Sequence, residues 1–387
     1  MLARISCLLG SAGLLLSLSL TANAQSDVYF ASNYAYRIET VADGLIQPWS
    51  MAWLPNGDML VTEKPGRLRV IRDGNLLPNA ITSTPEVFYE GQGGLFDVVL
   101  HPDFATNQIL YLSYSKALGD NSTTAILRAR LDNDRLLNVE EIFAANANGA
   151  SHYGGRLAFD DAGYLFLSLG DRQAPPSGDL ENHPAQDNSN HHGVMIRLND
   201  DGSVPADNPF VGQANALPEI WSSGHRSPQG LAFHPETGAL WETEHGPQGG
   251  DELNIIEAGK NYGWPVIGRG VNYGLGNPIH ETIMQDGMEQ PKHFWVPSIA
   301  TSGLMIYTGD KFPAWHGDIF AGGLGGMQLA HLILNDDFDA VVREETLAYG
   351  LGRIRDVRQG PDGYIYLAVE DRSADVPTAI VRLVPAN

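Results

Sequence analysis

The sequence has 387 residues and a formal net charge of −22 at pH 7, from 24 Lys and Arg against 46 Asp and Glu. Nucleic-acid binding depends on neutralising phosphates with basic side chains, so this acidic composition argues against a nucleic-acid partner. The only cysteine is Cys7, so the rest of the chain can form no disulfide and no Cys-ligated metal site. Any redox chemistry would therefore come from a bound cofactor.

The N-terminal segment predicts export. Residues 1–24 carry an early positive charge at Arg4, an apolar stretch over 8–20 and the small-residue sequence Ala-Asn-Ala at 22–24. That combination is typical of a secretory signal peptide, which is removed from the mature chain. We therefore expect a periplasmic or secreted protein. No later apolar run approaches the ~18 residues of a membrane helix, so no membrane span is expected.

One phrase recurs along the rest of the chain: an apolar stretch, a turn rich in Pro, Asn, Asp and Gly, and a second stretch of apolar and aromatic residues. Its copies span residues 50–63, 94–115, 155–171, 230–246, 303–324 and 354–371. Such alternation around Asn-Gly and Asp-Gly turns predicts antiparallel hairpins. Six units predict an all-β fold, a six-bladed β-propeller, with residues 25–387 as a single catalytic domain. A β-sandwich is the alternative.

The two ends of the domain are expected to meet. The strands predicted at 36–42 and 379–384 would pair within one blade, close the ring and hide its sheet edges. The polar stretch 172–192 is interpreted as a loop on one face. Its His183, His191 and His192 fit no standard metal spacing.

Polar residues directly before the inner strands are the first candidates for a site. Gln92 and His152 each precede an apolar strand and are followed by two glycines, which let a ligand approach the backbone closely. Arg226 and Ser227 occupy the same position in SSGHRSPQGLAF. Position alone leaves His152 open between a catalytic and a structural hydrogen-bonding role.

Two further motifs suggest charged ligands. The sequence EHGPQGGDELN, 244–254, places carboxylates beside a Gly-Pro turn, and hard cations such as calcium take carboxylate and carbonyl oxygens. It lacks the spacing of an EF-hand loop, so metal binding stays open. Arg353 and Arg355 are two apart on an extended strand and share a face. They predict an anionic ligand, or else salt bridges with Asp356 or Asp371.

Together these phrases resemble the soluble pyrroloquinoline-quinone (PQQ)-dependent sugar dehydrogenases of the glucose/sorbosone dehydrogenase family, and within it the aldose sugar dehydrogenases. The resemblance rests on QPWSMAWLPNGDMLVTEKPGRL, GQGGLFDVVLHP, HYGGRLAF, IRLNDDGSVPADNPF, GHRSPQGLAF, EHGPQGGDELN, NYGWP and GRIRDV, in family order. It implies a six-bladed propeller with PQQ and Ca²⁺ as cofactors. The implied reaction oxidises an aldose at the anomeric carbon to the lactone and passes electrons to an external acceptor.

The resemblance also implies roles for single residues. His152 would be the general base, and Gln92 and Arg226 would flank the reactive quinone carbonyl. The remaining implied cofactor contacts are Ser227, Tyr273, Leu324, Gly325, Gly326, Arg353, Ile354 and Arg355. The backbone carbonyls of Gly246 and Pro247 would bind one calcium, and Glu252 with the backbone of Tyr262 would bind a calcium of the aldose-type relatives; both sets need not hold.

One position departs from the family pattern: Gly325 stands where glucose dehydrogenase relatives carry a lysine that contacts the cofactor. Two other functions stay open from the residues alone. One is a calcium-dependent propeller lactonase, and the other is a non-catalytic propeller that binds a partner. We expect a monomer.

Overall fold

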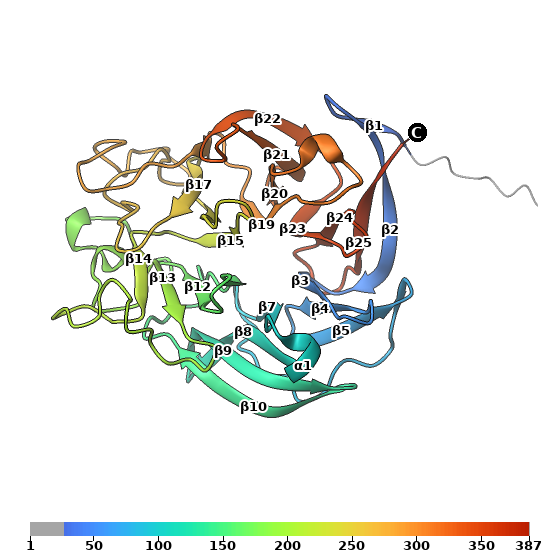
Figure 1. Ribbon diagram of the computed structural model, residues 1–387. Helices are drawn as coiled ribbons and strands as arrows, with labels where there is room; N and C mark the ends of the chain where they lie inside the picture. The colour runs from blue at the N-terminus through green and yellow to red at the C-terminus, as the bar shows by residue number, and fades with distance from the viewer. Residues whose placement is uncertain (1–26, 387) are drawn as a thin grey trace, which may run out of the picture.

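The computed structural model describes residues 27–386, so the predicted signal peptide lies outside the described residues. Six antiparallel sheets radiate around a common centre, and the predicted six-bladed β-propeller is confirmed (Figure 1). Within 27–386, no helix has the length and apolar character needed to cross a membrane.

Blades 1 to 5 follow the chain in order, four strands each. Blade 1 contains β3 (Pro48–Trp53), β4 (Met59–Glu63), β5 (Arg67–Arg72) and β6 (Asn75–Leu76). Blade 2 contains β7 (Leu95–Leu100), β8 (Ile109–Leu118), β9 (Asn121–Asp132) and β10 (Arg135–Ala144). Blade 3 contains β11 (Leu157–Phe159), β12 (Leu165–Leu169), β13 (Val194–Leu198) and β14 (Ile220–Ser223).

Blade 4 contains β15 (Pro228–Phe233), β16 (Leu240–Glu244), β17 (Asp251–Ile256) and β18 (His293–Trp295). Blade 5 contains β19 (Thr301–Ile306), β20 (Ile319–Gly323), β21 (Gln328–Leu334) and β22 (Val341–Leu347). The only α-helix in the described range is α1 (Phe104–Asn107), which lengthens the connection inside the second predicted hairpin. Single 3₁₀ turns cover Leu180–Asn182, Pro184–Gln186 and Pro313–Trp315.

Blade 6 closes the ring with both ends of the chain. It contains β23 (Arg353–Gln359), β24 (Ile365–Glu370) and β25 (Thr378–Pro385), followed by β2 (Ala35–Leu45) and β1 (Tyr29–Phe30). Strand β2 pairs antiparallel with β25, with Ile38 opposite Leu383, so the predicted pairing of the two ends is confirmed. The first strands of the blades contact each other in the closed order β3, β7, β11, β15, β19, β23 and back to β3.

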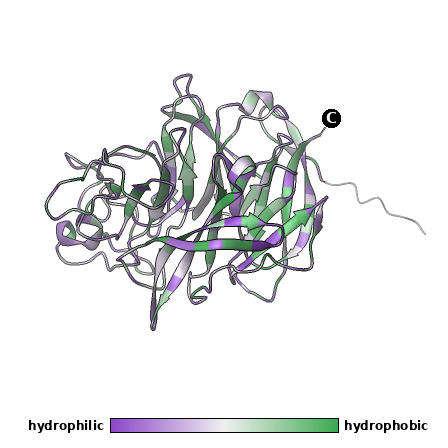
Figure 2. Ribbon diagram, turned by 60° about the horizontal axis from the view of Figure 1, so that its bottom comes forward, coloured by the Kyte–Doolittle hydropathy of each residue, from purple (hydrophilic) through white to green (hydrophobic). Residues whose placement is uncertain are grey.

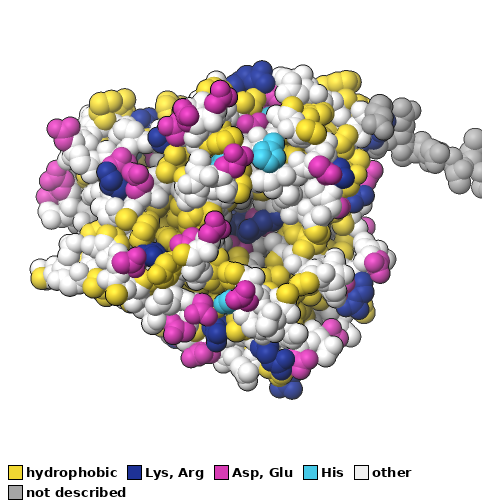
Figure 3. Space-filling view, viewed as in Figure 1, with side chains coloured by type: hydrophobic (Ala, Val, Ile, Leu, Met, Phe, Trp, Pro, Cys, Tyr) yellow, Lys and Arg dark blue, Asp and Glu magenta, His cyan; other side chains and the backbone are white. Residues whose placement is uncertain are grey.

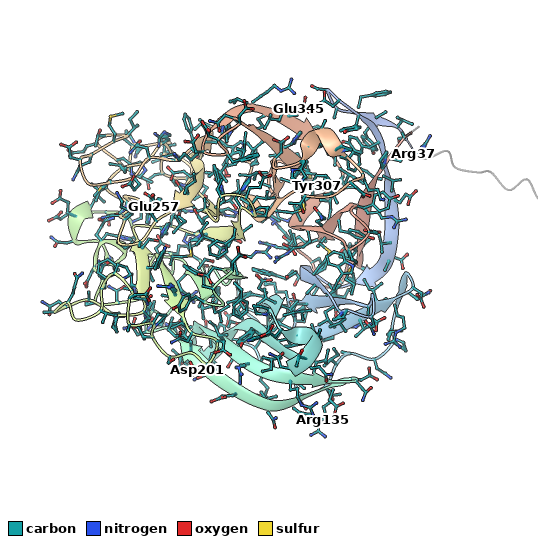
Figure 4. All side chains as sticks on the ribbon, in the orientation of Figure 1. Arg37, Arg135, Asp201, Glu257, Tyr307 and Glu345 are labelled. Atoms are coloured by element: carbon teal, nitrogen blue, oxygen red, sulfur yellow. The ribbon has the colours of Figure 1, made fainter. Side chains whose placement is uncertain are left out.

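Burial explains why the strands differ in composition. The second strands of blades 1, 3, 4 and 5 are buried along their whole length, because neighbouring blades cover both faces. They are therefore dominated by side chains that tolerate burial on both sides. The outer strand β10 is largely exposed and carries Arg135, Glu140 and Glu141. Figure 2 shows the hydrophobic residues along the strands, and Arg135 and Asp201 lie near the outer edge of the molecule in Figure 4.

A buried guanidinium links the inner strands. Arg156, directly before β11, has a side chain only 2% exposed, and its Nη1 lies 2.8 Å from Asp356 Oδ1 on β23. Its Nε donates to the Gln229 carbonyl on β15 at 2.7 Å. Its Nη2 donates to the Arg355 carbonyl at 3.0 Å, and the guanidinium lies 4.0 Å over the Trp49 ring. One side chain therefore connects blades 1, 3, 4 and 6.

A second arginine extends this network to blade 2. Arg358 Nε donates to Asp356 Oδ2 at 3.0 Å, and its Nη2 donates to Asp97 Oδ1 on β7 at 3.0 Å. Ser50 Oγ donates to the same Asp97 oxygen at 2.5 Å. Burial lowers the pKa of Arg156, while the charges of Asp356 and Asp97 oppose that shift. The guanidinium stays charged because arginine starts from a pKa above 12.

Replacing Arg156 with Met should destabilise the protein by about 3–5 kcal/mol, because it leaves Asp356 and Asp97 buried with less cationic charge. Urea unfolding followed by tryptophan fluorescence measures the loss. Arg130→Met is the matched control, since Arg130 and its partner Asp132 are 38% and 46% exposed. It should change stability by about 0.5 kcal/mol or less. Equal losses for the two variants would show that the network does not hold the ring.

Candidate active site

A cavity of about 460 Å³ opens at the central channel. Its lining comes from all six blades or their connecting loops and includes Trp49, Gln92, Gly154, Gln229, His245, Leu324, Gly325, Arg353 and Arg355. The space-filling view shows a hollow at the centre of this face with a basic side chain inside it (Figure 3). The volume lies in the range of pockets that bind small molecules and cofactors.

The cavity is basic although the protein is acidic. Lys64, Arg353, Arg355 and Arg372 line it, against Glu370 and Asp371, which leaves a surplus of two positive charges. Guanidinium groups suit the planar geometry of carboxylates. The cavity therefore favours an anionic ligand.

Glu370 holds the two predicted arginines in place. Arg353 donates to Glu370 Oε1 from Nε at 3.1 Å and from Nη2 at 2.9 Å, and Arg355 Nε donates to Oε2 at 2.9 Å. Burial raises the pKa of Glu370, but the charges and hydrogen bonds of both arginines outweigh it and lower the pKa overall. The salt-bridge partner suggested from the sequence, Asp356 or Asp371, is thus replaced by Glu370. One carboxylate between two guanidiniums leaves them a net positive charge.

Two groups hold His152 in place, and a third holds its partner Asp171. Its Nδ1 lies 2.6 Å from Asp171 Oδ1, its side chain is 7% exposed, and its backbone N–H donates to Gln92 Oε1 at 2.8 Å. Trp264 Nε1 donates to the other Asp171 oxygen at 2.7 Å. The φ of His152 is 44°, a left-handed value that non-glycine residues rarely adopt. Strain of this kind concentrates at functional sites, where the surroundings enforce it.

This arrangement sets the chemistry of the imidazole. Burial raises the pKa of Asp171, but the hydrogen bond and charge of His152 outweigh burial, so its pKa is lowered overall and it stays a carboxylate. A carboxylate at Nδ1 keeps the proton on that nitrogen in the neutral ring. Nε2 is then the nitrogen that can accept a proton, as in other His–Asp pairs.

A second, small cavity of about 20 Å³ adjoins the first, and His245 lines both. It brings together Arg226 and all four predicted metal ligands, Gly246, Pro247, Glu252 and Tyr262. Burial, with the charges of Arg226, Arg355 and His152, lowers the pKa of His245 to about 3, so this ring is neutral at pH 7.

The donor chemistry of the second cavity fits a hard cation. Burial and the charge of Glu244 raise the pKa of Glu252 to about 8, as expected for a buried carboxylate short of positive charge. The Arg269 guanidinium, 3.5 Å away, compensates in part. A Cβ at Gly246 would lie 2.3 Å from the Gly250 carbonyl, so only glycine permits this turn. Arg226 Nη1 donates to the Gly246 carbonyl at 2.7 Å, which leaves that oxygen one lone pair.

The other predicted residues are distributed unevenly. Leu324 and Gly325 line the large cavity, while the side chain of Ile354 packs in the hydrophobic core between blades 5 and 6. Ser227 is buried and its Oγ accepts from Gln229 Nε2 at 3.2 Å. Tyr273 is 67% exposed and lies outside both cavities.

Gly325 and Gly326 have no free amide to offer. Both backbone N–H groups donate to the Ile299 carbonyl, at 2.9 and 2.8 Å. They therefore cannot replace a missing lysine at this position without breaking those bonds.

Sequence reasoning missed several residues of the site: Trp49, Lys64, Asp171, His245, Trp264 and Glu370. Asp171 lies two residues after the end of β12, and Glu370 ends β24 opposite Arg353. Both residues could have been found from the sequence as acidic residues at or just after the end of a predicted strand.

Comparison with known proteins identifies relatives along nearly the whole chain. Residues 45–380 match the family model described as Glucose / Sorbosone dehydrogenase. Aldose sugar dehydrogenase YliI of Escherichia coli K12 is 40% identical over 359 residues, which cover 91% of this chain and 94% of the relative.

Two solved structures have the same fold. The apo-form of the soluble aldose sugar dehydrogenase from Escherichia coli superposes with a TM-score of 0.82 at 38% identity, over 91% of this chain and 100% of that one. The PQQ-bound form of aldose sugar dehydrogenase from Streptomyces coelicolor gives a TM-score of 0.72 at 26% identity, over 90% and 98%.

Close backbone packing beside His152 is testable with two glycines of blade 3. A Cβ at Gly154, φ +68°, would lie 2.3 Å from the Ser168 carbonyl, whereas Gly163, φ +86°, has nothing within 4 Å. Gly163→Ala should cost about 1–2 kcal/mol, the penalty of a left-handed side chain. Gly154→Ala should cost clearly more, because the backbones at Gly154 and Ser168 must separate. Urea unfolding compares the two; equal costs would argue against the tight packing.

Proposed function

Because the chain belongs to the glucose/sorbosone dehydrogenase family, we propose that it is a PQQ-dependent aldose sugar dehydrogenase. The observation that carries the proposal is the basic cavity with Arg353 and Arg355, built next to the His152–Asp171 pair. Oxidation of a sugar hydroxyl requires a hydride acceptor and a base, and the basic cavity would bind an anionic acceptor beside the positioned base. The relatives named above are aldose sugar dehydrogenases, which supports the same conclusion.

When bound, PQQ would supply the two-electron acceptor for the hydride of the anomeric C–H. Arg353, Arg355 and Lys64 would bind its carboxylates, and the neutral wall formed by Trp49, Leu324 and Gly325 would contact its rings. Gln92 keeps His152 in position through the backbone N–H.

His152 would remove the proton of the anomeric hydroxyl at Nε2. Loss of this proton from oxygen and of a hydride from C1 converts the cyclic aldose to its lactone. Asp171 stabilises the imidazolium that results, and Arg226 provides positive charge where negative charge develops. Calcium held by the Gly246 and Pro247 carbonyls would add Lewis-acid assistance. Glu252 and the Tyr262 backbone would hold the calcium of the aldose-type relatives, and both assignments need not hold.

The location and redox partner are part of the proposal. Residues 1–24 direct export, so the enzyme would act in the periplasm or outside the cell as a monomer. Electrons would leave to an external acceptor, because the cofactor has to return to its oxidised state before each further turnover.

One assay separates this proposal from its two rivals. Purified protein freed of metal and quinone should reduce a dye with an aldose only after both PQQ and Ca²⁺ are added. A lactonase would instead hydrolyse a lactone with Ca²⁺ alone, and a binding module would do neither. Either of those results, or full activity without PQQ, would overturn the assignment.

Replacing His152 with Gln should lower kcat by ~100-fold or more, the usual contribution of a positioned general base. PQQ affinity, measured by fluorescence quenching, should change little because His152 brings little charge to the cavity. Asp171→Asn should also lower kcat, since the amide no longer holds the Nδ1–H tautomer. A His152 variant with near wild-type kcat would remove this residue from the mechanism.

Gly325→Lys should tighten PQQ binding. A charged hydrogen bond contributes about 1.5–3 kcal/mol, roughly tenfold to a hundredfold in affinity, and the amides of Gly325 and Gly326 are already used. A Cβ at Gly325 would lie 3.3 Å from Ala300 Cβ, so Ala300 must shift by a few tenths of an ångström to accommodate the lysine. Isothermal titration measures Kd, with Gly326→Lys, outside the cavity lining, as the control. Unchanged affinity in Gly325→Lys would refute the expectation.

A further inference from the structure

Four polar side chains meet between blades 3 and 4, at the inner side of the small cavity. Glu242 and Glu244 lie on β16, Asn254 faces Glu242 across the β16–β17 pair, and His225 comes from the segment before β15. All four are buried, with Glu242 and His225 at 0% exposure. One ligand atom from each of His225, Glu242 and Glu244 lies within 4.8 Å of the other two.

The cluster is short of hydrogen-bond donors. Glu242 Oε1 and Asn254 Oδ1 are buried without a partner among the described residues. The Asn254 amide nitrogen reaches both carboxylates, Glu242 Oε2 at 3.2 Å and Glu244 Oε1 at 3.4 Å. Buried polar atoms are nearly always paired in folded proteins, and a buried carboxylate with an empty oxygen is costly. A group that supplies positive charge between these side chains would remove the cost.

His225 is oriented as a ligand. Its Nε2 lies 2.9 Å from Ser222 Oγ, and its Nδ1 points to Glu244 Oε1 at 3.4 Å, longer than the 2.7–2.9 Å of a charge-assisted hydrogen bond. Stacking on Tyr262, with ring centroids 4.7 Å apart, fixes the ring plane. If Nε2–H donates to Ser222, Nδ1 presents its lone pair to the cluster. That outer hydrogen bond is the arrangement found around metal-ligating histidines.

The donor set selects the class of ion. Ligands on opposite sides of a first-row ion lie about 4.2 Å apart, from bonds of about 2.1 Å, so the observed spacing accommodates such an ion. Imidazole suits zinc and iron, whereas carboxylate and carbonyl oxygens suit manganese, calcium and magnesium. One imidazole with two carboxylates therefore fits zinc, or manganese through its carboxylates, better than an ion that takes oxygen ligands alone. Two carboxylates neutralise a divalent charge. A half-turn of the Asn254 amide, which exchanges its oxygen and nitrogen, would add a fourth ligand.

We propose that His225, Glu242, Glu244 and Asn254 form a buried structural site for a divalent transition-metal ion, Zn²⁺ or Mn²⁺. Its ligands differ from the proposed calcium ligands Gly246, Pro247, Glu252 and Tyr262, although Glu244 lines the same small cavity. The proposal does not depend on the proposed function.

The ion would stabilise the wall of the small cavity by fixing the Glu244 carboxylate. Glu244 Oε2 accepts the backbone N–H of Arg226 at 2.5 Å and that of Ser227 at 3.3 Å. An ion on Glu244 Oε1 would therefore fix the carboxylate that holds the Arg226 backbone. It would also join β16, β17 and the segment before β15.

The test uses the full mature chain, stripped with a chelator and freed of PQQ. Zn²⁺ or Mn²⁺ should rebind at one equivalent per chain, measured by elemental analysis after gel filtration, and raise the melting temperature. Glu242→Gln keeps the size of the side chain and mimics a protonated acid. It should weaken transition-metal binding by at least tenfold and lose the thermal shift.

Glu252→Gln is the matched control, because Glu252 lies on the same sheet but belongs to the calcium set. It should keep the transition-metal equivalent. Binding abolished by Glu252→Gln and kept by Glu242→Gln would assign the ion to the other site and overturn the proposal. Wild-type protein that binds less than stoichiometric Zn²⁺ and Mn²⁺ would overturn it as well.

A second measurement needs no variant. Co²⁺ added to the stripped wild-type protein should give visible absorption bands that Zn²⁺ displaces and excess Ca²⁺ does not. Bands that Ca²⁺ displaces would contradict a transition-metal site at His225.

Discussion

The buried guanidinium of Arg156 is the interaction on which the architecture and the cavity both depend. It lies between Asp356 and the Trp49 ring and donates to the carbonyls of Gln229 and Arg355. The last two residues line the large cavity through their side chains. Removing a charge from water is costly, and Asp356 and Asp97 offset that cost only in the closed ring. Ring closure and cavity shape are thus maintained by the same set of contacts.

The chemistry of the site is divided among blades, so no single hairpin contains it. Blade 6 provides the paired arginines and Glu370, blade 3 provides the His152–Asp171 pair, and blade 4 provides the Gly246 turn. His245 lines both cavities and stays uncharged at pH 7, because burial and surrounding cations lower its pKa to about 3. A neutral group at the junction leaves the positive charge of the large cavity to its arginines and Lys64, and the proposed proton-accepting role to His152.

Local patterns predicted the fold, but only part of the site. Turn residues and alternating apolar stretches act over a few positions, so six hairpins and the β2–β25 closure could be predicted from sequence. Glu370 could not be distinguished from Asp371 as the partner of Arg353 without the register, because adjacent strand residues face opposite sides. Asp171 and Trp264 are 93 residues apart in the sequence, and only the arrangement of the blades in the propeller brings them into contact. Tyr273, on a long exposed loop, has no strand register to place it.

The distribution of charge gives the cavity a direction. Its cations are Lys64, from a connection of blade 1, and Arg353, Arg355 and Arg372, from blade 6. Blade 5 adds no free donor there, because the amides of Gly325 and Gly326 already donate to the Ile299 carbonyl. His152 and Arg226 belong to the segments before β11 and β15. A rigid planar anion anchored by its carboxylates at blades 6 and 1 would therefore present its other end to blades 3 and 4. The larger number of cations at blades 6 and 1 would therefore favour this orientation of the ligand, and the single guanidinium of Arg226 would lie at its other end.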